Sequence, residues 1–147
     1  MQDLVTVFGG SGFIGTQVVR ALAKQGLRVR VAVRQPHIAY NMRLMGDVGQ
    51  VDVVQANVRN EASVRRALEG ASAAINLVGV LYETGRQKFD AIQTEGARIV
   101  AAMARDMGVP RLIHMSALGA DAASEARYAR SKAEGEAAVS AAFPKAT

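Results

Sequence analysis

Cysteine and tryptophan are both absent from this 147-residue chain, and aromatic residues make up only 5% of it. Without cysteine, the chain forms no disulfide, has no thiolate nucleophile and builds no cysteine-rich metal site. Apolar runs are short, and none approaches the roughly 18 residues that a membrane-spanning helix needs. No basic leader precedes the first apolar stretch, so no signal peptide is expected. With only two histidines, His37 and His114, no metal site is expected either.

The chain is basic, with a net charge of +5, and this charge raises the question whether the protein binds nucleic acid. A nucleic-acid surface usually shows a basic stripe or patch. Here the arginines are scattered along the chain, with no basic block and no aromatic residues among them. We therefore do not expect nucleic acid as a partner. Attraction of an anionic ligand or an acidic surface remains open.

Short apolar stretches alternate with helical patterns along the whole chain. The expected strands cover residues 4–8, 27–34, 51–56, 71–79 and 111–117, and the expected helices run from the glycine-rich turn to about residue 26 and over 38–46, 61–70, 86–107 and 125–142. Such alternation predicts βαβ units with right-handed crossovers. We therefore predict one α/β domain over residues 1–147, a Rossmann-type doubly wound parallel sheet of order 3-2-1-4-5 with helices on both faces.

A glycine-rich turn, GGSGFIG at residues 9–15, joins the first strand to the first helix. Gly10, Gly12 and Gly15 satisfy the G-x-G-x-x-G pattern of dinucleotide-binding proteins. In that pattern the first glycines permit a tight turn, Gly12 lets the backbone approach a pyrophosphate, and Gly15 lets the helix pack closely. The helix N-terminus then presents N–H groups to the phosphates. A plain tight βα turn is the alternative interpretation.

The end of the second strand indicates which dinucleotide is favoured. An acidic residue usually stands about 20 positions after the glycines and binds the ribose 2′-hydroxyl of NAD. This chain has Arg34 there, in VAVRQP. A guanidinium binds a 2′-phosphate with two parallel hydrogen bonds. NADP(H) is therefore favoured, and NAD(H) stays open. Arg43 is interpreted as a helix-surface residue rather than a second phosphate ligand.

Four motifs occur in a fixed order: GGSGFIG, INLVG at 75–79, HMSALGA at 114–120 and YARSK at 128–132. Together they resemble the extended or atypical short-chain dehydrogenase/reductase (SDR) family. The run from Phe89 to Asp121 is most similar to the branch that contains the NAD(P)-binding accessory subunit of respiratory complex I and its bacterial relatives. The resemblance covers nearly all of residues 3–140.

The resemblance implies a set of cofactor contacts. It places Asn57, where the family usually has Asp, near the adenine. It also implies that the backbone of the segment from Asn76 to Gly79 lines the cofactor. The cofactor-binding residues implied by the glycine motif, Arg34 and the resemblance are Gly9, Gly10, Ser11, Gly12, Phe13, Ile14, Gly15, Arg34, Asn57, Val58, Leu77, Val78, Gly79, Tyr128 and Lys132.

Tyr128 and Lys132 stand four residues apart, so they share one helix face. A phenol is a poor acid–base catalyst at neutral pH, and a nearby ammonium favours its ionised form. By resemblance, Lys132 would also hold the nicotinamide ribose, Ser116 would steady a substrate carbonyl, and Tyr128 would donate the proton. These three are the candidate catalytic residues. An exposed tyrosine and a solvated lysine are the alternative interpretation.

Two functions follow from the resemblance. The first is an NADP(H)-binding subunit with a role in the assembly or stability of complex I, cytoplasmic or attached to the inner membrane through that partner. The second is an active NADP-dependent reductase or epimerase. Family members continue with a substrate-binding lobe that this chain lacks, so we expect it to be a fragment. The exposed sheet edge is compatible with homo-oligomers, and no direct membrane insertion is expected.

Overall fold

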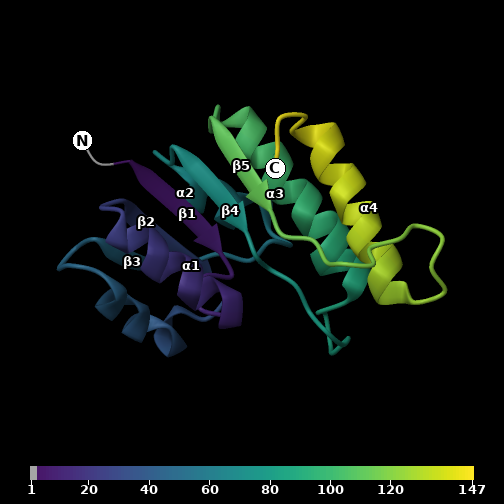
Figure 1. Ribbon diagram of the computed structural model, residues 1–147, viewed down its shortest axis with the longest axis horizontal. Helices are drawn as coiled ribbons and strands as arrows, with labels where there is room; N and C mark the ends of the chain where they lie inside the picture. The colour runs from purple at the N-terminus through teal and green to yellow at the C-terminus, as the bar shows by residue number, and fades with distance from the viewer. Residues whose placement is uncertain (1–2) are drawn as a thin grey trace.

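The structure, a computed structural model, describes residues 3–147 and contains one five-stranded parallel sheet (Figure 1). Its strands are β1 (Leu4–Phe8), β2 (Arg28–Val33), β3 (Val51–Gln55), β4 (Ala73–Asn76) and β5 (Arg111–His114). They lie in the order β3-β2-β1-β4-β5, and each pair is parallel. This is the predicted Rossmann-type order. The chain reverses its direction of winding between β1 and β4, which is where ligands bind in such sheets.

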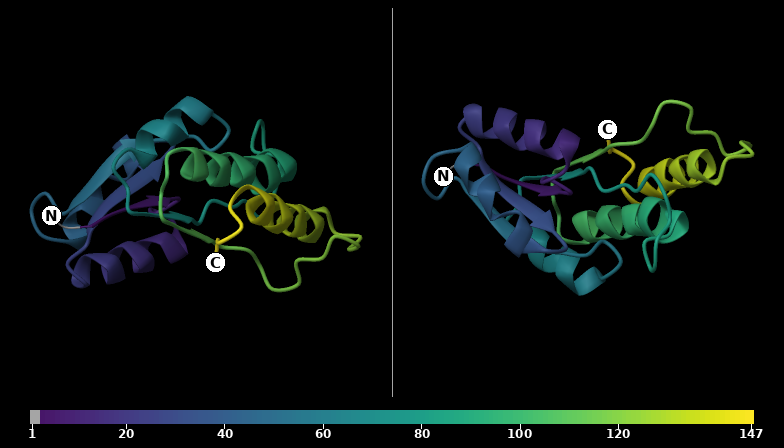
Figure 2. Two further views of the ribbon diagram at one scale, coloured as in Figure 1. Left: turned by 90° about the horizontal axis from the view of Figure 1, so that it is seen from above. Right: turned by 90° about the horizontal axis from the view of Figure 1, so that it is seen from below.

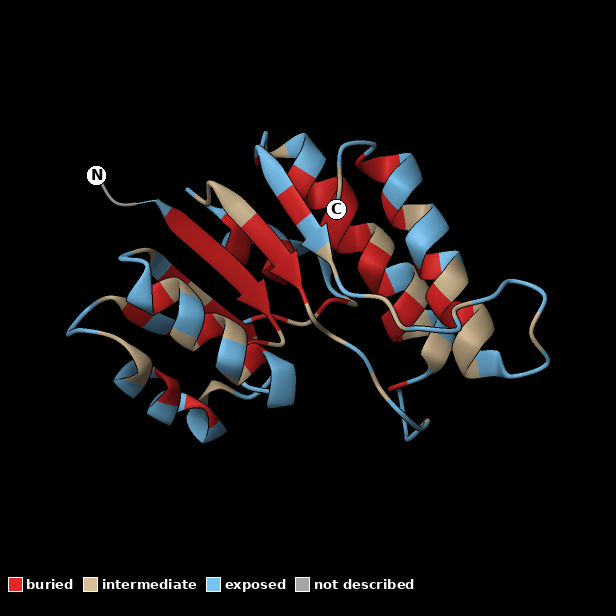
Figure 3. Ribbon diagram, in the orientation of Figure 1, coloured by how far each residue is buried: buried red, intermediate tan, exposed pale blue. Residues whose placement is uncertain are grey.

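Helices cover both faces of the sheet, as predicted (Figure 2). One face carries α1 (Phe13–Lys24), and the other carries α2 (Glu61–Leu68) and α3 (Ala97–Asp106), with α4 (Arg127–Ala142) packed against α3. Because both faces are covered, every residue of the central strand β1 is buried (Figure 3). The buried apolar side chains form two clusters, one on each side of the sheet.

The predicted helix over residues 38–46 is replaced by two short 3₁₀ segments, η1 (Pro36–Ile38) and η2 (Tyr40–Met45). Within η2 only Met42 is buried. A helix in a protein owes most of its stability to the packing of an apolar face. A single buried side chain does not supply such a face, so the segment keeps the tighter geometry.

The predicted helix over residues 86–107 begins later, and it begins as a π-helix. The π segment η3 (Asp90–Gly96) leads directly into α3. Close packing accompanies the wider turn: a Cβ added at Gly135 of α4 would collide with the carbonyl oxygen of Gln93. The residues before η3 form a turn instead, in which the Gln87 N–H donates to the Thr84 carbonyl at 2.8 Å.

β5 lies at one edge of the sheet, and the backbone of Thr147 runs beside it. The His114 N–H donates to the Thr147 carbonyl at 2.8 Å, and the Thr147 N–H donates to the Leu112 carbonyl at 3.0 Å. This alternation is the hydrogen-bond pattern of parallel strands. Across residues 3–147, we find no helix with the length and apolar character required to cross a membrane.

Candidate dinucleotide site

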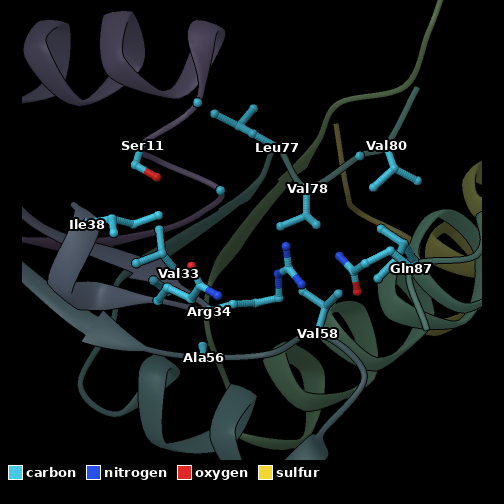
Figure 4. A pocket seen from close by; sticks show the side chains of 16 residues that line it. Ser11, Val33, Arg34, Ile38, Ala56, Val58, Leu77, Val78, Val80 and Gln87 are labelled. Atoms are coloured by element: carbon cyan, nitrogen blue, oxygen red, sulfur yellow. The ribbon is translucent and has the colours of Figure 1, made fainter. Parts of the chain in front are cut away.

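A cavity of about 330 Å³ opens at the carboxyl ends of the strands (Figure 4). Its size is in the usual range for small-molecule sites. The residues that line it come from the glycine turn, the end of β2, the segments that follow β2, β3 and β4, and η3. They are Gly9, Ser11, Gly12, Ala32, Val33, Arg34, Gln35, Ile38, Ala56, Val58, Leu77, Val78, Gly79, Val80, Gln87 and Ile92.

The glycine turn brings the start of α1 to this cavity. Gly9 has a φ of 76°, a left-handed conformation that favours glycine. The Gly12 N–H donates to the Gly9 carbonyl at 3.2 Å, which closes the turn. α1 then begins at Phe13 with no side-chain cap and no acidic residue in its first turn. The first turn of α1 therefore supplies no side chain that neutralises the positive end of the helix, and this end favours an anion at this edge of the cavity.

Four of the predicted glycine-loop residues do not line the cavity. A Cβ at Gly10 would lie 3.1–3.3 Å from valine side chains of the core, and a Cβ at Gly15 would collide with the backbone of Gly9 and Gly10. Both glycines therefore allow α1 to pack closely on the turn. Phe13 is 92% exposed, and Ile14 is also exposed. Gly9, Ser11 and Gly12 are the members of the motif at the cavity wall.

Arg34 follows β2, and its side chain extends across the cavity to lie between Val58 and Val78 (Figure 4). The residue is exposed, and within residues 3–147 it forms no ion pair. Its guanidinium is therefore available to an anionic ligand. Arg43 is engaged elsewhere, because its Nη2 lies 3.1 Å from Asp52 Oδ1 and its guanidinium stacks over the Tyr40 ring.

The segment after β3 contributes Ala56 and Val58 to the cavity, but not Asn57. The Asn57 Oδ1 atom accepts a hydrogen bond from the Arg59 N–H at 3.0 Å, and the Asn57 N–H donates to Ser63 Oγ at 2.9 Å. The side chain thus stabilises the local turn. The oxygen that the resemblance assigns to the adenine already has a partner in the protein.

Asn76, at the end of β4, orients the next cavity segment. Its Oδ1 atom accepts from the Val78 N–H at 3.2 Å, and its Nδ2 atom lies 3.3 Å from His114 Nδ1. Burial is the main cause that lowers the pKa of His114, and the charge of Lys132 lowers it further. Neutral His114 thus accepts the Asn76 amide hydrogen on Nδ1. Leu77, Val78 and Gly79 are held at the cavity wall by this arrangement.

The three candidate catalytic residues lie around β5 and α4, and none lines the cavity. Lys132 is only 5% exposed, and its Nζ donates to the Met115 carbonyl at 3.2 Å. Burial lowers the pKa of Lys132, and Glu136 partly opposes this shift. A Cβ at Gly79 would lie 3.7 Å from this Nζ, so Lys132 reaches the backbone next to the cavity.

Ser116 and Tyr128 differ in their surroundings. Ser116 Oγ is buried and has no hydrogen-bond partner within residues 3–147. The Tyr128 ring packs edge-on against Phe89, with 5.8 Å between ring centroids. An unpaired buried hydroxyl is costly, so Ser116 Oγ has unused hydrogen-bonding capacity. No group of three or more potential metal ligands occurs among the described residues.

Gln93 connects the cavity to α4 and was missed by sequence reasoning. Its Oε1 atom accepts from the Val80 N–H at 3.1 Å, and its Nε2 atom donates to Ser131 Oγ at 2.8 Å. Ser131 Oγ in turn donates to the Tyr128 carbonyl at 2.9 Å. A buried polar residue inside an apolar helical pattern is the signal that could have identified it. Gln35, Ile38 and Gln87 were missed as well.

The fold and this site define a Rossmann-type α/β protein of the dinucleotide-binding class. The chain belongs to the NmrA-like family, whose model matches residues 1–137. This membership confirms the resemblance to the extended SDR proteins. The fold is also that of a solved structure described as a putative NAD-dependent epimerase/dehydratase from Bacillus halodurans. The match has a TM-score of 0.80 and 22% identity, and it covers 93% of this chain and 64% of that one.

Two curated relatives share more of the sequence. The mouse protein NADH dehydrogenase [ubiquinone] 1 alpha subcomplex subunit 9, mitochondrial, is 36% identical over 144 residues, which are 97% of this chain and 38% of that protein. The Ceramide reductase of Caulobacter vibrioides is 36% identical over 145 residues, which are 99% of this chain and 44% of that protein. The chain therefore spans less than half the length of either relative.

Proposed function

We propose that residues 1–147 form a nucleotide-binding domain that holds a nicotinamide dinucleotide in the cavity at the carboxyl ends of the strands. The observation that carries this proposal is the uncapped N-terminus of α1 beside the glycine turn. Pyrophosphate binds such a helix end through backbone N–H groups and the helix dipole. Membership of the NmrA-like family and the likeness to an NAD-dependent epimerase/dehydratase support it.

Within this proposal, Arg34 selects NADP(H) over NAD(H). Its guanidinium lies in the cavity and forms no ion pair within the described chain. A 2′-phosphate on the adenosine ribose is the anion that such a group pairs with in this fold. The acidic residue that usually stands at this position, which would bind a ribose hydroxyl and repel a phosphate, is replaced by Arg34.

Arg34→Ala is expected to weaken NADPH binding by about 10- to 100-fold, as the loss of a charge-assisted hydrogen-bonded pair predicts. NADH binding should change by less than about threefold, because NADH has no 2′-phosphate. Calorimetric titration of both nucleotides measures this difference. Arg43→Ala is the matched control, since Arg43 is paired with Asp52 and should leave both affinities intact. Equal losses for the two nucleotides would contradict the role of Arg34.

For the biological role, we propose that the protein is a nucleotide-binding subunit or assembly factor of respiratory complex I, held at the inner membrane by that partner. The sequence identity to the mouse complex I protein supports this role. The test is to delete the gene and follow complex I on native gels. A loss of assembled complex that is restored by the intact protein supports the role, and unchanged assembly contradicts it.

The second candidate is an NADP-dependent reductase, and the buried, unpaired Ser116 Oγ favours it. A bound reduced nicotinamide supplies a hydride to a carbonyl carbon. Ser116 would bond the carbonyl oxygen, and Tyr128 would give that oxygen its proton, with Lys132 nearby on the same helix. If the protein oxidises NADPH with a carbonyl substrate, Tyr128→Phe should reduce turnover by at least about 100-fold. NADPH affinity should stay within about threefold, and unchanged turnover would remove Tyr128 from the mechanism.

A further inference from the structure

Gln87 presents an amide to the cavity from a segment that no motif identifies. It closes the turn with Thr84, and its side chain lines the cavity beside Val80 and Ile92. The residue is only 9% exposed, and its Oε1 atom is buried without a hydrogen-bond partner within residues 3–147. Figure 4 shows the amide directed toward the part of the cavity bounded by Val58, Val78 and the Arg34 guanidinium.

An unpaired buried amide oxygen of this kind is costly unless a ligand supplies the missing hydrogen bond. The loss of water around such an acceptor is then not offset by any hydrogen bond. The amide nitrogen is the atom turned toward the cavity, and a half-turn of the amide about its last side-chain torsion exchanges the two atoms, so the oxygen can meet a ligand without any movement of the backbone. This end of the cavity therefore needs a ligand with a hydrogen-bond donor on its edge.

The surroundings of the amide indicate which part of a dinucleotide lies there. Arg34 is the partner proposed for the 2′-phosphate, and that phosphate is attached to the adenosine ribose. The adenosine half thus occupies the end of the cavity near Arg34, and the nicotinamide half extends toward Ser116, Tyr128 and Lys132. Apolar side chains from Val58, Val78 and Ile92 line the adenosine end around the Arg34 guanidinium, whose plane suits the face of a planar base.

We propose that the Gln87 amide reads the base of the bound dinucleotide by bonding N6 and N7 of adenine, and that Asn57 does not. A glutamine amide offers an acceptor beside a donor, and the N6–H₂ and N7 edge of adenine offers the complementary pair. Asn57 does not line the cavity, and its oxygen already accepts from the Arg59 N–H. This inference rests on the proposed dinucleotide function and assigns the base specificity of the same site.

Hypoxanthine provides the matched comparison, because it presents O6 in place of the N6 amino group. Along this edge it offers two acceptors, so the Gln87 oxygen loses its donor. A bidentate amide–base pair supplies about 1–3 kcal/mol of discrimination. The chain is therefore expected to bind NADPH about 5- to 150-fold more tightly than the hypoxanthine analogue of NADPH.

The experiment titrates the 147-residue chain and two variants with both nucleotides. Gln87→Met keeps the length of the side chain and removes its hydrogen bonds, so the affinity ratio should fall to within about twofold of unity, mainly through weaker NADPH binding. Asn57→Ala removes the oxygen that Asn57 would offer to adenine and should retain the wild-type ratio. Thermal unfolding of each variant without ligand checks that the fold is intact.

Each outcome has a distinct meaning. A wild-type ratio near unity overturns the inference even if Gln87→Met does not fold, because that ratio needs no variant. A ratio that falls in Asn57→Ala but not in Gln87→Met also overturns it and assigns the base contact to Asn57. Equal loss of both affinities in Gln87→Met would assign Gln87 a structural role only. If the wild-type chain binds neither nucleotide, the proposed dinucleotide function fails and the inference fails with it.

Discussion

Replacing Gly12 with valine is expected to weaken NADPH binding by at least about 100-fold while the chain stays folded, a loss of roughly 2.7 kcal/mol in binding free energy. Gly12 is the N-cap of α1 and lines the cavity. Its φ of −76° and ψ of −174° are extended values that valine adopts without strain. A valine side chain there would hold a phosphate away from the first N–H groups of the helix.

The space around Gly12 explains why this substitution should spare the fold. Among the described residues, the Gly9 carbonyl oxygen, at 3.5 Å, is the one atom that a Cβ would approach within 4 Å. Valine is a poorer N-cap than glycine, so a stability loss of about 1 kcal/mol is expected. Gln17→Val, one turn along the exposed face of α1, is the control and should bind NADPH normally. Normal affinity in Gly12→Val would show that the phosphates bind elsewhere.

Replacing Gly15 with alanine is expected to have the opposite outcome, a loss of about 3 kcal/mol in the free energy of unfolding. A Cβ at Gly15 would collide with the Gly9 oxygen and the Gly10 backbone. These atoms belong to the turn itself, so the first turn of α1 has to move to relieve the collision. For a chain of this size the thermal midpoint should fall by roughly 10 °C.

Helix propensity makes this second test stringent. Alanine is favoured over glycine in a helix by about 1 kcal/mol, so any destabilisation must come from the collision. Gly12→Ala adds the same methyl group three residues earlier, where space is open, and is the matched control. Its midpoint should change by no more than about 4 °C. A Gly15→Ala chain as stable as the wild type would mean that the turn adapts freely.

The strands and their order were predictable because their signals are local. Each strand is a short apolar run, and the rules for βαβ units leave few ways to arrange five of them. The glycine turn and Arg34 could also be predicted from the sequence, since both stand at strand ends, where this fold binds ligands. Gln35 and Ile38 follow the same strand end, and that rule could have identified them too.

The remaining site residues depend on packing between distant segments. Gln87 lies at the cavity because a turn with Thr84 replaces the predicted start of a helix, and no periodicity marks that turn. Asn57 stands at the family position, but it does not line the cavity, and its oxygen accepts from the Arg59 N–H. Asparagine side chains often bond to the local backbone in this way, and the sequence alone does not show when they do.

Gln93 and Gly135 together fix the position of α4 relative to the cavity in which the nucleotide is proposed to bind. The Gln93 side-chain amide bonds the Val80 N–H at the cavity and Ser131 on α4. The backbone carbonyl oxygen of Gln93 packs directly on Gly135 of the same helix. One residue of η3, Gln93, thus contacts both the Val80 segment and α4. The position of the Val80 segment at the cavity and the position of α4 are therefore coupled through Gln93.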